Sequence, residues 1–208
     1  MARIAILGGT GKLGQRLAAR ALDEGYRVNV LGRDLKRVKI QNERLTLMAG
    51  NAETGQGLDV AFEGCAYVVC CVGSLLPVLD RVMQEVVPRL EDHKLLKRFV
   101  FISRLGTGET RDQARLVSGA LQSALPVLMM PLFKDINLAE ARIRQSKLPY
   151  TILRSTRLTD DAPTGGVVAV GPKDPPPHRV TRSDLADYVL QLLATQELLR
   201  GEATVGSK

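Results

Sequence analysis

The feature that most constrains the fold of this chain is a glycine-rich turn between a short apolar run and a helix-like segment. Residues 3–7 are mostly apolar, and the next seven residues read Gly8-Gly9-Thr10-Gly11-Lys12-Leu13-Gly14. The glycines fit two spacings, Gly9-x-Gly11-x-x-Gly14 and Gly8-x-x-Gly11-x-x-Gly14. Without Cβ atoms the turn can close, the backbone can approach a pyrophosphate, and the helix can pack on the strand. Free N–H groups and the helix dipole then favour a bound anion.

The rest of the chain alternates short β-branched runs with helix-length segments, a pattern typical of a parallel sheet with helices on both faces. We expect strands at residues 3–7, 27–31, 45–48, 66–72, 98–103 and 150–154, and helices at residues 11–24, 77–90, 134–146 and 183–195. The run at 66–72 is apolar throughout, as a central strand should be. The pattern predicts an α/β, Rossmann-type, doubly wound parallel sheet in a single domain, residues 1–208.

Local signals add detail to this pattern. Asp135 is placed for the first turn of the helix at 134–146, and either Ser183 or Thr181 can cap the last helix. Residues 106–130 and 160–177 interrupt the alternation, the second with a possible strand at 167–170. Both stretches follow expected strands, so they belong at the carboxyl edge of the sheet, where open α/β sheets bind ligands. We therefore expect the substrate-side segments at about residues 104–133 and 155–178.

Composition indicates a compact chain but does not identify its ligand. The 208 residues are 45% hydrophobic with a net charge of +7, and no apolar run approaches the ~20 residues that span a bilayer. The basic residues are scattered and accompany no nucleic-acid signature. We expect a phosphate-bearing small ligand, and neither a nucleic-acid nor a membrane partner. Cys65, Cys70 and Cys71 do not have zinc-site spacing, which favours reduced structural cysteines, no metal and a cytoplasmic location.

The residue after the second strand discriminates between the two nicotinamide dinucleotides. An NAD site carries an acidic side chain about 20 residues past the glycines, which accepts from the ribose 2′-hydroxyl. Here the strand leads into Leu31-Gly32-Arg33-Asp34. The Arg33 guanidinium suits a 2′-phosphate by a bidentate, charge-assisted hydrogen bond. We interpret Asp34 as the N-cap of a short helix, so the sequence favours NADP(H).

Four segments together resemble a known family. They are Gly8–Gly14, Leu31-Gly-Arg-Asp34, Arg98-Phe-Val-Phe-Ile-Ser103 and Leu148-Pro-Tyr-Thr-Ile-Leu-Arg154. They look like the atypical short-chain dehydrogenases/reductases, in the NmrA-like, NAD(P)H-binding branch, and within it most like the biliverdin reductase B/flavin reductase group. The resemblance covers essentially the whole chain and specifies fold and cofactor better than substrate.

The resemblance implies roles for residues in six segments. The glycine loop would hold the pyrophosphate, Arg33 the 2′-phosphate, and the loop after the third strand would border the adenine. The fourth strand would pass under the ribose, and the ends of the fifth and sixth strands would lie by the nicotinamide. The implied cofactor residues are Gly8, Thr10, Gly11, Lys12, Leu13, Arg33, Asn51, Ala52, Cys71, Val72, Gly73, Ser74, Ser103, Ser155 and Thr156.

The main short-chain dehydrogenases use a Tyr-x-x-x-Lys pair, and no tyrosine of this chain has a lysine four residues on. The candidate catalytic residues are therefore Ser103, which could donate a hydrogen bond or merely satisfy a strand end, and Arg104. Arg104 stands where relatives often have a second serine. It could bind a substrate carboxylate or phosphate, or be solvated. Met130, Phe133 and Leu158 could form an apolar wall for a flat ring.

Hydride transfer to a conjugated acceptor needs few polar groups, because the acceptor delocalises its charge and water can supply the proton. We therefore expect an NADPH-dependent reductase of a flavin-, quinone- or tetrapyrrole-like acceptor, acting as a monomer or homodimer. The alternative is a non-catalytic NADP(H)-binding redox sensor or regulatory protein, as NmrA-like proteins resemble.

Overall fold

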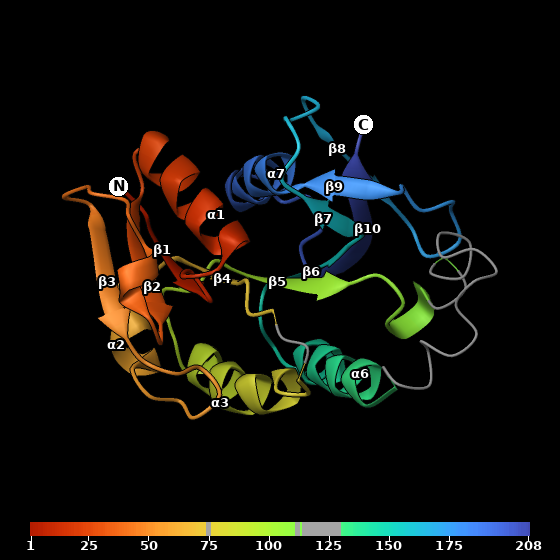
Figure 1. Ribbon diagram of the computed structural model, residues 1–208. Coiled ribbons are helices and arrows are strands. Elements are labelled where there is room, and N and C mark those ends of the chain that lie inside the picture. The colour runs from red at the N-terminus through yellow and green to blue at the C-terminus, as the bar shows by residue number, and fades with distance from the viewer. Residues whose placement is uncertain (74–75, 111–112, 114–129) are drawn as a thin grey trace.

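A computed structural model describes residues 1–73, 76–110, 113 and 130–208 (Figure 1). Its centre is an eight-stranded sheet in the order β3-β2-β1-β4-β5-β6-β10-β8, and β7 and β9 form a separate two-stranded sheet. Every neighbouring pair is parallel except β10 with β8. The strands are β1 Arg3–Leu7, β2 Arg27–Gly32, β3 Leu45–Ala49, β4 Tyr67–Cys70, β5 Arg98–Arg104, β6 Tyr150–Ser155, β7 Arg157–Thr159, β8 Val167–Val170, β9 Arg179–Thr181 and β10 Gly201–Ser207.

Helices cover both faces of the sheet (Figure 1). The helices α1 (Lys12–Asp23) and α7 (Arg182–Ala194) pack together on one face. On the other face lie α2 (Leu58–Phe62), α3 (Leu79–Glu91) and α6 (Met130–Gln145). Two apolar cores result, one on each side of the sheet. The predicted doubly wound α/β fold is confirmed, and its topological switch point lies between β1 and β4.

The predicted strands and helices all form, with ends within a few residues of those expected. The possible strand at 167–170 is β8, the antiparallel edge strand. The sequence pattern did not indicate α2, β7, β9 or β10. Strand β10 lies between β6 and β8, and only Ala203 and Val205 contribute apolar side chains to the core. Its two glycines and alternating polar residues dilute the β-branched signal on which the prediction depends.

Asp135 has a different role from the one predicted. Helix α6 begins at Met130, four residues earlier than expected, and Pro131 is acceptable there because a first-turn residue needs no N–H partner. Asp135 is therefore in the second turn and buried. Its carboxylate accepts hydrogen bonds from the backbone N–H groups of Leu79 (2.8 Å) and Asp80 (3.1 Å). It caps α3, whose own N-cap residue, Val78, has no polar side chain.

Polar side chains also fix both ends of α7. Of the two predicted caps, Thr181 is the one formed: its hydroxyl oxygen accepts from the backbone N–H of Asp184 at 3.0 Å. At the other end the buried Arg98 donates from its two terminal nitrogens to the backbone oxygens of Thr195 (3.0 Å) and Glu197 (2.9 Å). These bonds satisfy carbonyl groups beyond the last turn, which would otherwise lack partners.

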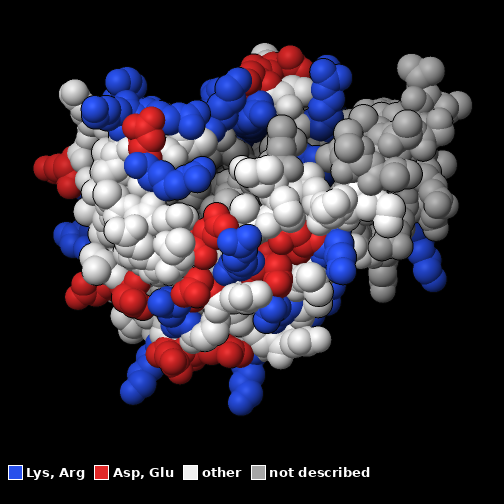
Figure 2. Space-filling model, turned by 60° about the horizontal axis from the view of Figure 1, so that its bottom comes forward, with Lys and Arg blue, Asp and Glu red and all other residues white. Residues whose placement is uncertain are grey.

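The surface formed by α3 and α6 carries mixed charge. Figure 2 shows acidic and basic side chains interspersed over the lower part of this view. Arg142 pairs with Asp80, and Arg89 pairs with Asp59 (3.1 Å) and Glu85 (2.7 Å). In the part of the chain that the structure describes, no helix is long and apolar enough to cross a membrane. The three cysteines are free, and burial raises the pKa of Cys65 and Cys70 to about 12.

Candidate functional site

The glycine loop lies at the switch point and touches the end of β4. Gly8 has a φ of +72°, and its carbonyl oxygen accepts from the N–H of Gly11 at 3.0 Å. A Cβ on Gly8 would lie 2.9 Å from the carbonyl carbon of Cys71. Glycine is therefore required at this position for two reasons: the backbone is left-handed, and the residue after β4 lies too close for a Cβ atom.

The other glycines of the loop differ in how much space surrounds them. A Cβ on Gly14 would lie 2.6 Å from the Gly8 oxygen, and one on Gly9 would lie 2.7 Å from a methyl group of Val30. Both positions serve packing. A Cβ on Gly11 would meet only the Gly8 oxygen, at 3.2 Å. The remaining side of Gly11 is open, which is where a ligand could approach the backbone.

Helix α1 begins directly after Gly11 without a side-chain cap and without an acidic residue in its first turn. Its first N–H groups, including those of Lys12 and Leu13, have no intrahelical partner because no turn precedes them. Uncapped N–H groups and the positive end of the helix dipole point at one place, next to the open side of Gly11. This arrangement fits a pyrophosphate.

Positive side chains follow the end of β2, beside this loop. Thr10 lies against Gly32, since a Cβ on Gly32 would lie 2.3 Å from the Thr10 methyl group. Arg33, Lys36 and Arg37 are exposed, and no ion pair holds them within the described residues. Asp34 occupies the predicted N-cap position of a short 3₁₀ helix, Leu35–Arg37, but its carboxylate makes no capping hydrogen bond.

Lys12 extends from the glycine loop to the far side of the sheet edge. Its Nζ lies 2.8 Å from Oδ2 of Asp160, which follows β7, and Nη1 of Arg182 lies 2.9 Å from Oδ1 of the same carboxylate. The hydrogen bond from Lys12 lowers the pKa of Asp160. The side chain predicted to contact the pyrophosphate is therefore held by an acidic partner in this structure.

The remaining predicted cofactor residues of this half lie after β3 and β4. Oδ1 of Asn51 accepts from the N–H of Glu53 at 3.0 Å, which closes a tight turn. Ala52 and Val72 pack at the border of the apolar core, and a Cβ on Gly73 would meet nothing within 4 Å. Ser74 lies outside the described residues.

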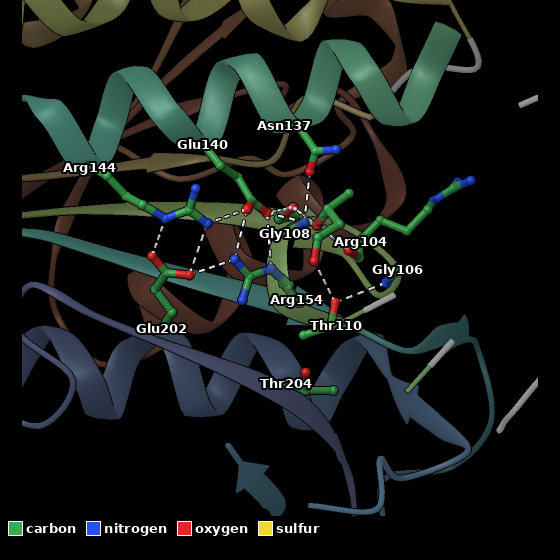
Figure 3. Close-up of polar contacts among 12 residues, drawn as sticks. Arg104, Gly106, Gly108, Thr110, Asn137, Glu140, Arg144, Arg154, Glu202 and Thr204 are labelled. Atoms are coloured by element: carbon green, nitrogen blue, oxygen red, sulfur yellow. Dashed lines mark hydrogen bonds and ion pairs between the residues drawn. The ribbon is translucent and has the colours of Figure 1, made fainter. Parts of the chain in front are cut away.

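In the other half of the sheet edge the polar groups bind one another. The hydroxyl of Ser103, at the end of β5, donates to Oε1 of Glu140 at 2.6 Å, and the Thr107 hydroxyl donates to the same oxygen at 2.8 Å. The Ser103 proton is thus directed toward α6. Arg104 is exposed, and Figure 3 shows its side chain extending away from this cluster.

Glu140 is the centre of a buried ion network that joins α6, β6 and β10 (Figure 3). Glu140 is 0% exposed and Arg154 is 3% exposed. Arg154 donates from Nε (3.1 Å) and Nη2 (2.7 Å) to Glu140, and from Nη2 to Glu202 at 2.5 Å. Arg144 joins the same two carboxylates, at 2.7 Å from Glu140 and 2.5 Å from Glu202. Burial opposes ionisation of Glu202, but hydrogen bonds from Arg144 and Arg154 hold its pKa below the ordinary value.

The predicted residues after β6 are also bound within the protein. The Ser155 hydroxyl donates to the Ser103 carbonyl at 3.0 Å, and the Thr156 hydroxyl donates to the Val205 carbonyl at 3.2 Å. Of the three predicted apolar residues, Met130 is 63% exposed. Phe133 and Leu158 are half-buried.

The structure thus brings the predicted residues that it describes to one edge of the sheet. They form two groups, one around β1 and β2 and one around β5 and β6. The sequence pattern did not indicate the second group's network. Arg154 belongs to one of the family-like segments, but Glu140, Arg144, Glu202 and Thr107 were not among the predicted site residues. The signal available was a pair of oppositely charged residues four apart on one helix, Glu140 and Arg144. Their distant partners could not be read from that spacing.

A family model described as NAD(P)H-binding matches residues 8–196. A curated relative, the photosystem II assembly factor Ycf39 of Synechocystis sp., is 25% identical over 156 residues, which are 73% of this chain and 44% of that protein. The chain therefore spans less than half the length of that relative.

Two solved structures share the fold. The anaerobilin reductase ChuY of Escherichia coli O157:H7 superposes with a TM-score of 0.81 at 20% identity, covering 99% of this chain and 97% of that one. A short-chain dehydrogenase/reductase of Veillonella parvula, in complex with NADP, has a TM-score of 0.79 at 23% identity, covering 99% and 94%. With the glycine loop, the uncapped helix and the family match in place, the chain belongs to the NAD(P)H-binding family.

Proposed function

We propose that this protein is an NADPH-dependent reductase of a flat, conjugated acceptor of the flavin, quinone or tetrapyrrole type. The observation that carries the proposal is a contrast between two parts of the sheet edge. The glycine loop after β1 can bind an anion, whereas the ends of β5 and β6 carry no tyrosine–lysine pair. When bound, the dinucleotide supplies the hydride. The residues of the chain hold it and position the acceptor.

The preference for NADPH rests on Arg33. Its guanidinium is exposed at the tip of β2 and has no acidic partner among the described residues. Lys36 and Arg37 add positive charge on the next turn. A 2′-phosphate would find charge-assisted donors here, whereas the 2′-hydroxyl of NADH would gain no charge-assisted contact from these cations.

The class of acceptor follows from the direction of the Ser103 proton. Because Ser103 donates to Glu140, its hydroxyl does not offer that proton to a substrate. A ketone reduced to an alcohol needs such a donor, but a conjugated ring spreads the incoming charge and takes its proton from water. Arg104, Met130, Phe133 and Leu158 are the proposed acceptor contacts. The similarity to an anaerobilin reductase supports a tetrapyrrole among the candidate acceptors.

A second candidate function has its own support. The curated relative is an assembly factor, and the polar groups at the end of β5 are bound within the protein. Both observations suit a non-catalytic NADP(H)-binding redox sensor or regulatory protein. In either case we propose a monomer or homodimer in the cytoplasm with a small-molecule ligand and no nucleic-acid partner. The mixed charge on the α3–α6 face supports the last point.

Oxidation of NADPH by the purified protein tests the two candidates. The acceptors are FMN, riboflavin, a quinone and biliverdin, and NADH is the control donor. Turnover of any acceptor, faster with NADPH than with NADH, is the expected result. Tight NADPH binding in the same sample without turnover of any acceptor would contradict the reductase and favour the sensor.

A further inference from the structure

The buried ion network borders a cavity to which neither the family match nor the sequence motifs assign a function. The cavity has a volume of about 420 Å³ and is lined by residues from the loop after β5, from α6, β6 and β10, and from the Pro172 segment. Gln113 holds the Pro172 side of the wall. Its amide donates to the carbonyls of Gly171 and Asp174, both at 2.7 Å, and its oxygen accepts from the Thr204 hydroxyl at 2.8 Å. Cavities of this size hold small ligands.

The hydrogen-bonding groups that line the cavity are mostly used. The Thr110 hydroxyl accepts from the Gly106 N–H at 3.1 Å and donates to the Thr107 carbonyl at 2.7 Å. The Thr204 hydroxyl is bound to Gln113. Both oxygens of Glu202 accept from arginines. The wall therefore has little capacity left to bind a ligand that donates hydrogen bonds.

The two arginines are the exceptions. In Arg154, Nε and Nη2 bind the two carboxylates, but Nη1 has no partner among the described residues. Arg144 likewise uses only Nε and Nη2, but its side chain is partly exposed and its unbound nitrogen lies on the side of α6 in Figure 3. Thr159 Oγ1 is the one fully buried side-chain nitrogen or oxygen without a partner in that part of the chain, so Nη1 of Arg154 is not fully buried, and Arg154 is among the residues that line the cavity. Figure 3 shows this nitrogen turned away from both carboxylates, on the side of Thr204.

The other buried arginine shows how a purely structural arginine is arranged. Arg98, at the opposite end of β5, uses both terminal nitrogens on backbone carbonyls. Both side chains are nearly inaccessible, at 2% for Arg98 and 3% for Arg154. Only Arg154 presents a terminal N–H group to a cavity. It does so directly beside Ser103, its register partner across β5 and β6.

The charge of the network determines which oxygen fits. Arg144 and Arg154 are balanced by Glu140 and Glu202, so the wall is formally neutral. A carboxylate or phosphate at Nη1 would gain no net attraction from this neutral wall to offset the loss of its hydration. An uncharged carbonyl oxygen accepts from Nη1 at a much smaller desolvation cost. We infer that this cavity is the subsite that binds an uncharged carbonyl oxygen of the acceptor through Arg154, which rests on the proposed reductase function.

A matched pair of ligands tests the subsite without turnover. Lumiflavin and phenazine are both flat, uncharged and tricyclic, but only lumiflavin carries carbonyl groups. Each is titrated into the protein saturated with NADP⁺ while the guanidinium NMR signals of Arg154 and Arg98 are recorded. We expect lumiflavin to shift the Arg154 signal and leave Arg98 unchanged, and phenazine to shift neither. An unmoved Arg154 signal at saturating lumiflavin, or an equal shift with phenazine, would overturn the subsite.

Matched variants give a second measurement. Arg154→Lys keeps the charge between the carboxylates but removes the spare N–H group, so the dissociation constant of lumiflavin should rise about tenfold. Phenazine binding should not change. Arg98→Lys, the same substitution at the structural site, should alter neither ligand. Equal weakening of both ligands by Arg154→Lys would contradict the inference.

Failure of the subsite and failure of the proposed function can be distinguished. Oxidation of NADPH by lumiflavin with an unmoved Arg154 signal would overturn the subsite and retain the reductase. A shifted Arg154 signal without oxidation of NADPH by any acceptor of the panel would retain carbonyl binding by this cavity and overturn the reductase.

Discussion

The two halves of the sheet edge differ in whether their polar groups have partners within the protein. Around β1 and β2 the chain leaves groups unused: the first N–H groups of α1, the open side of Gly11, and the guanidinium of Arg33. Around β5, β6 and β10 it uses nearly every polar group on another, with Glu140 accepting five hydrogen bonds from four side chains. The unused N–H groups and the guanidinium of the first half can bind an anionic ligand. In the second half most polar groups already have partners within the protein, and among its buried groups Nη1 of Arg154 remains for a neutral ligand.

The largest effect on stability should come from disrupting the ion network around Glu140. Glu140→Gln removes the charge that balances buried Arg154, and we expect a loss of about 3 kcal/mol in the free energy of unfolding, measured with urea. Glu85→Gln is the control, because the Glu85–Arg89 pair is partly exposed and should cost under about 1 kcal/mol. Equal losses would mean that the buried network does not differ from a surface ion pair.

A smaller effect on stability should distinguish Gly14, which is closely packed, from Gly11, which has one open side. Gly14→Ala places a Cβ 2.6 Å from the Gly8 oxygen, and we expect it to destabilise the fold by about 2 kcal/mol. Gly11→Ala should cost under about 1 kcal/mol in stability but weaken NADPH binding. The measurements are urea unfolding and isothermal titration. Full NADPH affinity in folded Gly11→Ala would show that the open side of Gly11 does not face the ligand.

Asp184 gives the second half a pH dependence. Burial would raise its pKa, but hydrogen bonds from Ser207, Thr164 and Thr181 lower it to about 2. Because the folded pKa is depressed, the stabilisation is fully present above the unfolded pKa and is lost as the pH falls toward 2.

The difference in unfolding free energy between the wild type and Asp184→Asn should therefore shrink by about 1–2 kcal/mol between pH 5 and pH 2.5. A difference that stays constant over this range would contradict the lowered pKa of Asp184. Asp161→Asn, at an exposed ion pair with Arg179, is the control and should show little change.

The two halves also differ in how far the sequence predicts them. The first half is local: Gly8 to Gly14 and the strand ending before Arg33 lie within a short stretch, and their chemistry is visible in residue types and spacing. The second half joins Ser103, Glu140, Arg154 and Glu202, which meet only after three parallel strands and α6 have been assembled. No spacing rule covers such distances.

The same reason explains the misassigned Asp135 and the missed β10. Asp135 lies at the start of a helical pattern, but its partners, Leu79 and Asp80, belong to a helix more than fifty residues earlier. Strand β10 exists because β6 and β8 flank it, and its own residues alternate too weakly to indicate a strand. Local patterns therefore predicted the elements, and tertiary contacts decided the roles of these side chains.

The most direct test of the account is the ratio of the dissociation constants of NADH and NADPH in Arg33→Glu. Arg27→Glu makes the same charge change at the opposite end of β2 and is the control. We predict that the wild type and Arg27→Glu prefer NADPH. Arg33→Glu should lose about 10- to 100-fold in NADPH affinity with little change for NADH, since one charge-assisted contact is removed. An unchanged ratio in Arg33→Glu would contradict the placement of the 2′-phosphate at the tip of β2.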